Sequence, residues 1–265
     1  MSFIDSHCHL NFFFKKNTIS LILQRALKAS VHHCINVGTS FNDWNLYYEL
    51  AIHHKNQLSY TVGIHPLCIN LNWRNELNKI NDFFLSKVPP VAIGEIGLDY
   101  FYLPKEKNKA ESIKKLQINV FSEQLKLALK FNCPIIIHSR NAFQACIDII
   151  EFYKINWNLV IFHCFTEGPK SINMLNERGG IASFTGIVTY KNAESIRKAA
   201  LAQGVDKLIL ETDSPYLAPM PYRSKTNEPA YIKNIAEFCA LLFGVDIETI
   251  KKHTNENTRL FFNLC

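Results

Sequence analysis

The chain has 265 residues, of which 48% are hydrophobic and 20% are charged, as in ordinary globular proteins and unlike disordered chains. No apolar stretch approaches the roughly 20 residues of a membrane-spanning helix, and no signal peptide precedes the first strand, so we expect a cytoplasmic protein without a membrane anchor. The net charge of +6 is compatible with a polyanionic partner but does not establish one. The eight cysteines form no C-x-x-C pair, and we expect them to be reduced.

Short apolar segments alternate with helical patterns along the whole chain. We predict strands near residues 2–7, 31–37, 58–63, 90–95, 133–138, 158–163, 180–185 and 207–212. Between them, apolar spacings of three and four residues, as at Ile19, Leu23 and Ala26, indicate helices. Eight strands, each followed by a helix, predict an α/β fold of the TIM (β/α)8 barrel type, with one domain over residues 1–265.

The first strand leads directly into His7 and His9. Alternate residues of a strand share one face, so the two imidazoles should lie about 6.6 Å apart along the strand. Cys8 between them should point to the opposite face. A pair of this kind is suited to chelating one metal ion, although an isolated His-x-His can also be two ordinary polar residues.

Four later apolar runs also close on a histidine or a carboxylate. These residues are Glu95, His138, His163 and Asp213. The runs are continuous, as expected for parallel strands that are buried on both faces. The carboxyl ends of such strands meet at one rim of a barrel, where enzymes of this architecture build their active sites. We therefore expect all of these side chains to converge with the first histidine pair.

Four imidazoles and two carboxylates form a donor set that suits Mg²⁺, Mn²⁺ or Zn²⁺. Six ligands fit two ions better than one, with a carboxylate shared between them. We predict one ion on His7, His9, Glu95 and Asp213, and a second on Glu95, His138 and His163. Two such ions favour hydrolysis, most naturally of a phosphoester. Glu95 would be the bridge, and Asp213 could accept the proton of the attacking water.

Several residues near these strand ends are candidates for substrate binding. His65 follows another strand, Arg140 follows His138 by two residues, and Arg223 lies in the loop after the last strand. Arginine binds phosphate oxygens through two parallel hydrogen bonds. Tyr100, Phe101 and Tyr102 follow Glu95 closely and could stack on a nucleobase or pack under a lid, and both interpretations stay open. The longest connection from a strand to its helix is expected over residues 97–112, where it would shape a cleft.

Six segments carry a resemblance to a known family: residues 5–10, 63–66, 94–100, 137–140, 162–165 and 211–219. In order and spacing they resemble the signature blocks of TatD-type metal-dependent hydrolases of the amidohydrolase superfamily, closest to the bacterial YcfH-like branch. The resemblance implies a TIM barrel and a 3′–5′ exodeoxyribonuclease acting on single-stranded DNA. It also implies metal ligation by the six residues above and substrate contact at His65. Nothing in the sequence indicates an obligatory protein partner.

Two segments depart from the family pattern. Ser224 stands where many members have glycine, and we expect it to restrict that loop. Thr166, Glu167 and Gly168 stand where much of the family has Ser-Gly-Ser, which puts an acid near the point of phosphate entry. Neither change touches a predicted metal ligand, so they concern substrate preference rather than activity.

Two other functions are compatible with the sequence. One is hydrolysis of a different ester, since members of the family are linked to removing D-amino acids from tRNA; the reaction product would distinguish it. The other is a non-enzymatic metal-binding or scaffold protein that kept the fold. The complete six-residue ligand set argues against the second, because structure alone does not require six polar groups on one rim.

Overall fold

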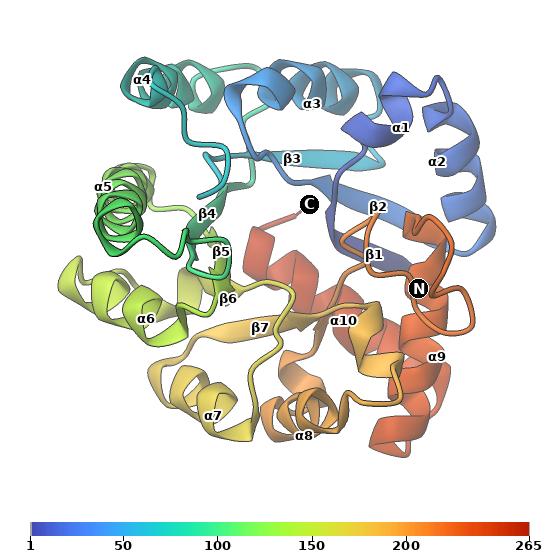
Figure 1. Ribbon diagram of the computed structural model, residues 1–265. Helices are drawn as coiled ribbons and strands as arrows, with labels where there is room; N and C mark the ends of the chain where they lie inside the picture. Colours follow the sequence, from blue (N-terminus) through green and yellow to red (C-terminus); the bar gives the residue numbers. More distant parts are fainter. Residues whose placement is uncertain (1, 265) are drawn as a thin grey trace.

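The computed structural model describes residues 2–264 and contains one sheet of parallel strands in the order β1 to β8 (Figure 1). The strands are β1 Phe3–Cys8, β2 Val31–Asn36, β3 Leu58–Val62, β4 Ala92–Asp99, β5 Ile135–Arg140, β6 Val160–Phe162, β7 Ile181–Phe184 and β8 Ile209–Leu210. Backbone hydrogen bonds from Asp213 N to His7 O (2.9 Å) and from His9 N to Ser214 O (2.8 Å) join the two edges of the sheet. The sheet therefore closes into a barrel, and the predicted TIM barrel is confirmed.

The helices surround the barrel in chain order (Figure 1). They are α1 Asn11–Lys15, α2 Ile19–Lys28, α3 Phe41–His53, α4 Trp73–Phe84, α5 Lys107–Phe131, α6 Phe143–Phe152, α7 Pro169–Arg178, α8 Glu194–Gln203, α9 Ile232–Phe243 and α10 Ile247–Phe262. Short 3-10 turns lie at Trp157–Leu159, Gly186–Thr189, Val205–Lys207 and Pro229–Tyr231. Within residues 2–264, no helix is both long enough and apolar enough to cross a membrane.

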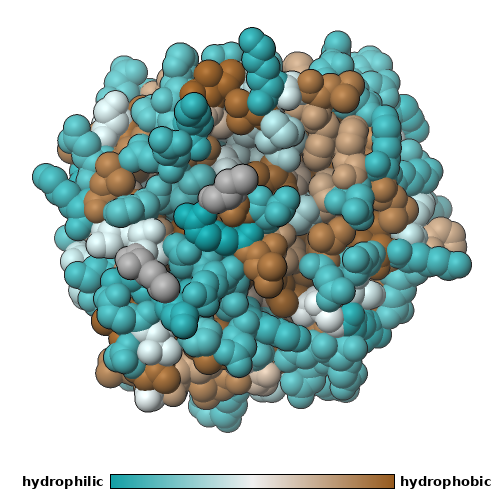
Figure 2. Space-filling view, turned by 180° about the vertical axis from the view of Figure 1, so that it is seen from behind, coloured by the Kyte–Doolittle hydropathy of each residue, from teal (hydrophilic) through white to brown (hydrophobic). Residues whose placement is uncertain are grey.

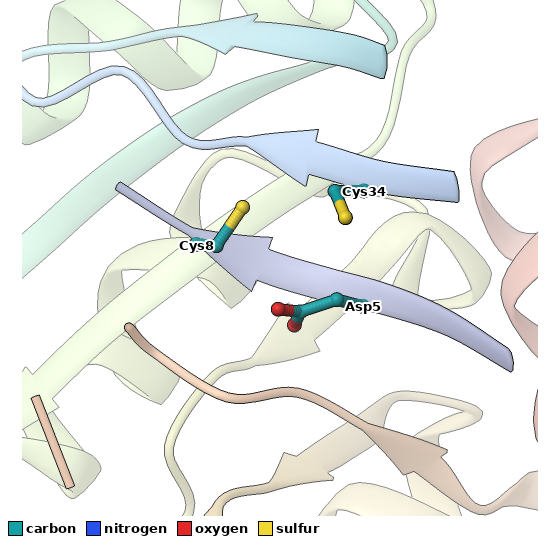
Figure 3. Close-up of side chains that lie close together, drawn as sticks. All are labelled: Asp5, Cys8 and Cys34. Atoms are coloured by element: carbon teal, nitrogen blue, oxygen red, sulfur yellow. The ribbon is translucent and has the colours of Figure 1, made fainter. Parts of the chain in front are cut away.

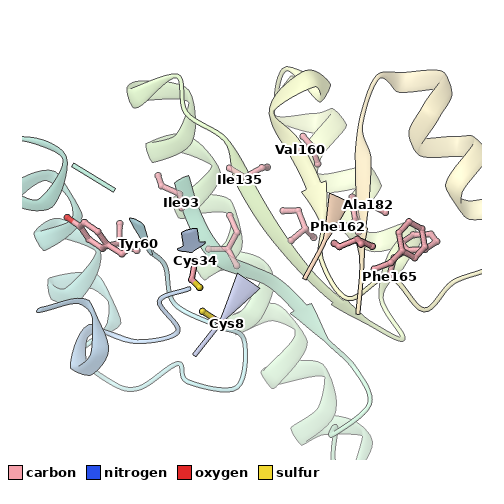
Figure 4. Close-up of a cluster of buried hydrophobic side chains, with 14 of the residues drawn as sticks. Cys8, Cys34, Tyr60, Ile93, Ile135, Val160, Phe162, Phe165 and Ala182 are labelled. Carbon is pink, nitrogen blue, oxygen red and sulfur yellow. The ribbon is translucent and has the colours of Figure 1, made fainter. Parts of the chain in front are cut away.

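Two hydrophobic clusters hold the barrel together. The larger one lies between strands and helices and includes Ile135 and Phe162 (Figure 4). The smaller one includes Ile136 and, from the last helix, Phe262. Because Ile135 and Ile136 are neighbours on one strand, they face opposite sides of it, and both are buried. This double burial explains why the strands read as continuous apolar runs.

The surface seen from behind the view of Figure 1 is mostly hydrophilic, with hydrophobic residues set between the polar ones (Figure 2). Large exposed side chains such as Leu241 and Leu260 occur on α9 and α10. Apolar residues scattered in this way are usual on globular proteins. The polar cluster described next is instead buried at the strand ends.

The segment after Glu95 differs from the sequence prediction. Strand β4 continues to Asp99, because its ladder with β5 runs on through the pair Asp99 and Arg140. Helix α5 then begins at Lys107, so this connection spans residues 100–106 and the predicted range of 97–112 is wrong. The longest connection from a strand to its helix is instead the one from β8 to α9, over residues 211–231. The seven described cysteines are free thiols, as predicted, and Cys265 lies outside the described residues.

Candidate active site

The carboxylate of Glu95 lies at the centre of a cluster of histidines at the ends of the strands. It is 3% exposed and comes from the middle of β4. Its Oε1 atom lies 2.7 Å from His163 Nε2, 2.8 Å from His138 Nδ1 and 3.4 Å from His65 Nε2. These three imidazoles, His138 within β5 and the other two after β6 and β3, therefore gather around one carboxylate oxygen.

The other oxygen of Glu95 faces the first histidine pair. Glu95 Oε2 lies 3.5 Å from His7 Nε2 and 3.9 Å from His9 Nε2. Asp213 approaches the same pair, with its Oδ1 3.3 Å from His9 Nε2 and 3.7 Å from His7 Nε2. The structure thus brings the six candidate ligands together around Glu95.

Charges within the cluster compensate one another. Burial favours the neutral form of Glu95, but the surrounding histidines, His163 first, outweigh it and hold the Glu95 pKa well below its usual range. Burial likewise opposes the charged form of His163, while Glu95 and Glu211 raise its pKa well above the usual range. The pKa of His7 is lowered by burial and then by the charge of His163. Glu95 is therefore ionised at neutral pH.

The donor atoms fit a divalent cation. His7 Nε2 and His9 Nε2 lie only 3.3 Å apart, so two lone pairs would repel each other unless a proton or a cation lies between them. The donor atoms of His7, His9 and Glu95 lie within 4.8 Å of one another, as do those of His65, Glu95 and His138. Imidazole nitrogens and carboxylate oxygens are the ligands of Zn²⁺ and Mn²⁺ in proteins. Each oxygen of Glu95 therefore has a set of ligands that could hold an ion.

Two acidic residues behind the histidines were missed in the sequence. Asp99 Oδ2 lies 3.1 Å from His138 Nε2. Glu211 lies 3.5 Å from His163 Nδ1 and 3.9 Å from His7 Nδ1. The signal for Glu211 was present, because it stands two residues before Asp213. Asp99 gave no such signal, because the strand appeared to end before it.

Asp5 holds the two edges of the barrel together beneath the cluster. Its carboxylate accepts hydrogen bonds from Thr212 N (2.8 Å) and Thr212 Oγ1 (2.5 Å). Burial raises the pKa of Asp5 to about 7, against the effect of these bonds. Figure 3 shows Asp5 close to Cys8 and Cys34 of the first two strands. Cys8 is fully buried in the larger hydrophobic cluster.

A cavity of about 680 Å³ opens above the cluster, and it includes only some of the predicted substrate residues. His65 and Arg140 line it. Tyr100 does not, because it packs against the hydrophobic core. Arg223 also lies outside the lining and instead stacks on Tyr190, 4.3 Å from the ring centre.

Arg140 is held in place by two aromatic residues that precede α5. Its guanidinium carbon lies 3.9 Å from the ring centre of Phe101 and 4.9 Å from that of Tyr102. Its Nη1 donates a hydrogen bond to Tyr102 Oη at 3.1 Å. Of the three aromatic residues that the sequence suggested for stacking, Tyr102 lines the cavity, whereas Tyr100 and Phe101 do not.

The two departures from the family pattern lie at the edge of the site. Ser224 does not have a positive φ angle, so serine adopts this backbone conformation without strain. Thr166 lines the cavity, whereas its neighbour Glu167 does not. The acid expected near the phosphate entry is thus outside the cavity wall.

Fold, site and relatives together define the class of protein, which is a metal-dependent hydrolase built on a TIM barrel. Residues 4–263 match the family model described as TatD related DNase. The chain belongs to the TatD family, as its signature segments suggested.

Relatives in this family extend over the whole chain. The uncharacterized metal-dependent hydrolase YcfH of Escherichia coli is 32% identical over 100% of this chain and 97% of its own length. A protein of the same description from Buchnera aphidicola, BU355, is 35% identical, with 100% of both chains covered. The 3′-5′ ssDNA/RNA exonuclease TatD of Erwinia amylovora is 29% identical over 92% of this chain and 93% of its own.

The fold is also found in solved structures. YJJV, a TatD homolog from Escherichia coli, has a TM-score of 0.89 at 24% identity and covers 99% of this chain and 98% of its own. The Escherichia coli phosphotriesterase homology protein, solved with phosphate in its active site, has a TM-score of 0.73 at 13% identity, with 98% of both chains covered. At these identities the likeness supports the fold alone.

Proposed function

We propose that the protein is a 3′–5′ exodeoxyribonuclease that cleaves phosphodiester bonds of single-stranded DNA with two divalent ions. The observation that carries the proposal is the position of Glu95, whose two oxygens each face a separate group of imidazoles. The name of the Erwinia amylovora relative supports both the substrate and the direction.

The ligands divide between the two oxygens of Glu95. Oε2 with His7, His9 and Asp213 would hold one ion, and Oε1 with His138 and His163 would hold the other. When bound, Mg²⁺, Mn²⁺ or Zn²⁺ at such positions activates a water molecule and stabilises both the attacking and the leaving oxygen. His65 also faces Oε1, at 3.4 Å, and its place in the cavity wall suits contact with the scissile phosphate.

Asp213 is the candidate proton acceptor. It lines the cavity, and its side chain is 13% exposed. Burial would raise its pKa, but the hydrogen bond from His9 and the neighbouring histidine charges lower it below the usual range. Asp213 is therefore ionised at neutral pH and open to the side from which substrate enters, as a general base must be.

Arg140 and Tyr102 form the part of the cavity wall suited to DNA. The guanidinium presents hydrogen-bond donors to phosphate oxygens, and the two adjacent rings hold it in place. Tyr102 is 59% exposed, and its ring offers a face for a nucleobase. Stacking of this kind needs an unpaired base, which favours single strands.

The test is hydrolysis of a 3′-labelled single-stranded DNA oligomer by chelator-stripped protein, with Mg²⁺, Mn²⁺ or Zn²⁺ added back singly. Metal-restored release of labelled mononucleotide is expected, and the His138→Ala variant should release none. An oligomer with a blocked 3′ end serves as the control for direction. If the protein binds two ions but releases no nucleotide with any of them, the nuclease assignment is wrong, and D-aminoacyl-tRNA is the next substrate to test.

A further inference from the structure

Two ring nitrogens in the cluster are buried without a hydrogen-bond partner among the described residues. They are His7 Nδ1 and His163 Nδ1. The two rings stack nearly parallel, with centres 4.1 Å apart, although the residues belong to different halves of the ligand set. A buried imidazole nitrogen without a partner costs about 1–3 kcal/mol, so the surroundings of this pair need an explanation.

Glu211 is the carboxylate that faces both of these nitrogens. Its Oε1 lies 3.5 Å from His163 Nδ1, and its Oε2 lies 3.9 Å from His7 Nδ1. The carboxylate is 1% exposed and is fixed in orientation by two other donors. Cys164 N donates to Oε1 and Ser183 Oγ donates to Oε2, both at 2.6 Å. Glu211 therefore cannot turn toward one histidine without losing a bond.

We propose that Glu211 is a positioning residue that sets the tautomer and orientation of His7 and His163 together, so that the affinities of both ion positions depend on this single carboxylate. The proposal rests on the two-ion function above. With the proton on Nδ1, each ring presents Nε2 to Glu95, at 3.5 Å for His7 and 2.7 Å for His163. An acceptor behind a ligating imidazole is a usual source of metal affinity.

Asp99 provides the matched comparison. It also stands behind a candidate ligand, with Oδ2 3.1 Å from His138 Nε2. The structure records no contact of Asp99 with a second histidine of the cluster among residues 2–264. Loss of Asp99 should therefore weaken one ion position, whereas loss of Glu211 should weaken both.

The experiment titrates chelator-stripped wild-type protein, Glu211→Gln and Asp99→Asn with Mn²⁺ or Zn²⁺, following the heat of binding and the number of ions retained. Wild-type protein should show two binding events. Glu211→Gln should weaken both by roughly 10- to 100-fold, and Asp99→Asn should weaken one by a similar factor. Nitrogen NMR of the histidine rings should report loss of the Nδ1–H tautomer at two residues in Glu211→Gln.

Ser183→Ala is a second test in case Glu211→Gln misfolds. It removes the hydrogen bond to Glu211 Oε2 and leaves the Glu211 side chain in place. It should weaken both events by a smaller factor. If wild-type protein binds two ions and both Glu211→Gln and Ser183→Ala weaken only one event, the inference is wrong while the function stands. Wild-type protein that binds fewer than two ions overturns the two-ion function and the inference with it.

Discussion

Gly97 gives the sharpest test of how the barrel fixes the site. It pairs with His138 across β4 and β5, with φ at +135°. A Cβ atom added there would lie 2.1 Å from the carbonyl oxygen of His138, so the two strands would have to separate by about 1 Å to restore the 3.0 Å that Cβ atoms normally keep. At Gly97, strand β4 therefore contacts the backbone of His138, one of the candidate metal ligands on β5.

Two effects add up in Gly97→Ala. The unusual backbone conformation costs about 1–3 kcal/mol for a residue with a side chain. Forcing the strands apart adds about 1–3 kcal/mol, as in other overpacked interiors. We therefore expect the free energy of unfolding to fall by about 4 kcal/mol. A displacement of about 1 Å at His138 should also reduce kcat/KM by about 100-fold.

Gly204→Ala is the control for the backbone term alone. Gly204 follows α8 with φ at +84°, and a Cβ atom there would meet nothing within 4 Å. The free energy of unfolding of Gly204→Ala should fall by about 1–3 kcal/mol, with unchanged activity. Urea unfolding of the metal-free proteins and the DNA hydrolysis assay measure both quantities. Equal stability and equal activity of the two variants would refute the reasoning.

Three further changes test separate parts of the structure. Glu95→Gln should fold and yet lose at least about 1,000-fold in kcat/KM, or about 4 kcal/mol, because both ion positions share this carboxylate; near-wild-type rates would contradict its assignment. Arg140→Ala should raise KM for longer DNA while leaving metal content unchanged, with Tyr102→Phe as a milder control; lost metal would instead mean that Arg140 orients a ligand. Burial, followed by the charge of Arg259, lowers the pKa of His33 to about 4, so the native state binds fewer protons than the unfolded state between pH 6.5 and 4. The free energy of unfolding should thus fall by roughly 2 kcal/mol as the pH drops through this range. In His33→Gln, the free energy of unfolding measured with urea should depend less on pH.

The sequence predicted the barrel and the convergence of the candidate ligands for one physical reason. Strands buried on both faces read as apolar runs, so the first polar residue after each run marks the rim. Glu95, His138 and His163 were found in this way. The same rule failed at Asp99, because polar residues of β4 that point into the site look like the end of the strand.

The aromatic residues after β4 show a different limit of the sequence. Tyr100 continues the ladder, its N donating to Arg140 O at 2.9 Å, and its ring packs against the core. The chain then turns, with Asp99 Oδ1 accepting from Phe101 N at 3.0 Å, and this turn brings Tyr102 back to the guanidinium. The sequence suggested three aromatic residues here, and it could not distinguish among them, because a turn of one or two residues decides which ring reaches the cavity.

The orientation of the histidine rings is fixed by hydrogen-bond acceptors next to them at the strand ends, rather than by the loops that line the cavity. His9 Nδ1 lies 3.1 Å from Val37 O, His138 Nε2 lies 3.1 Å from Asp99, and Glu211 faces the two remaining rings. All three acceptors belong to strand ends or to residues directly after them, which the closed ladder holds in place. Loop changes in this chain should therefore alter which substrate binds, whereas small changes at the strand ends, such as an added methyl group, should disable metal binding and catalysis together.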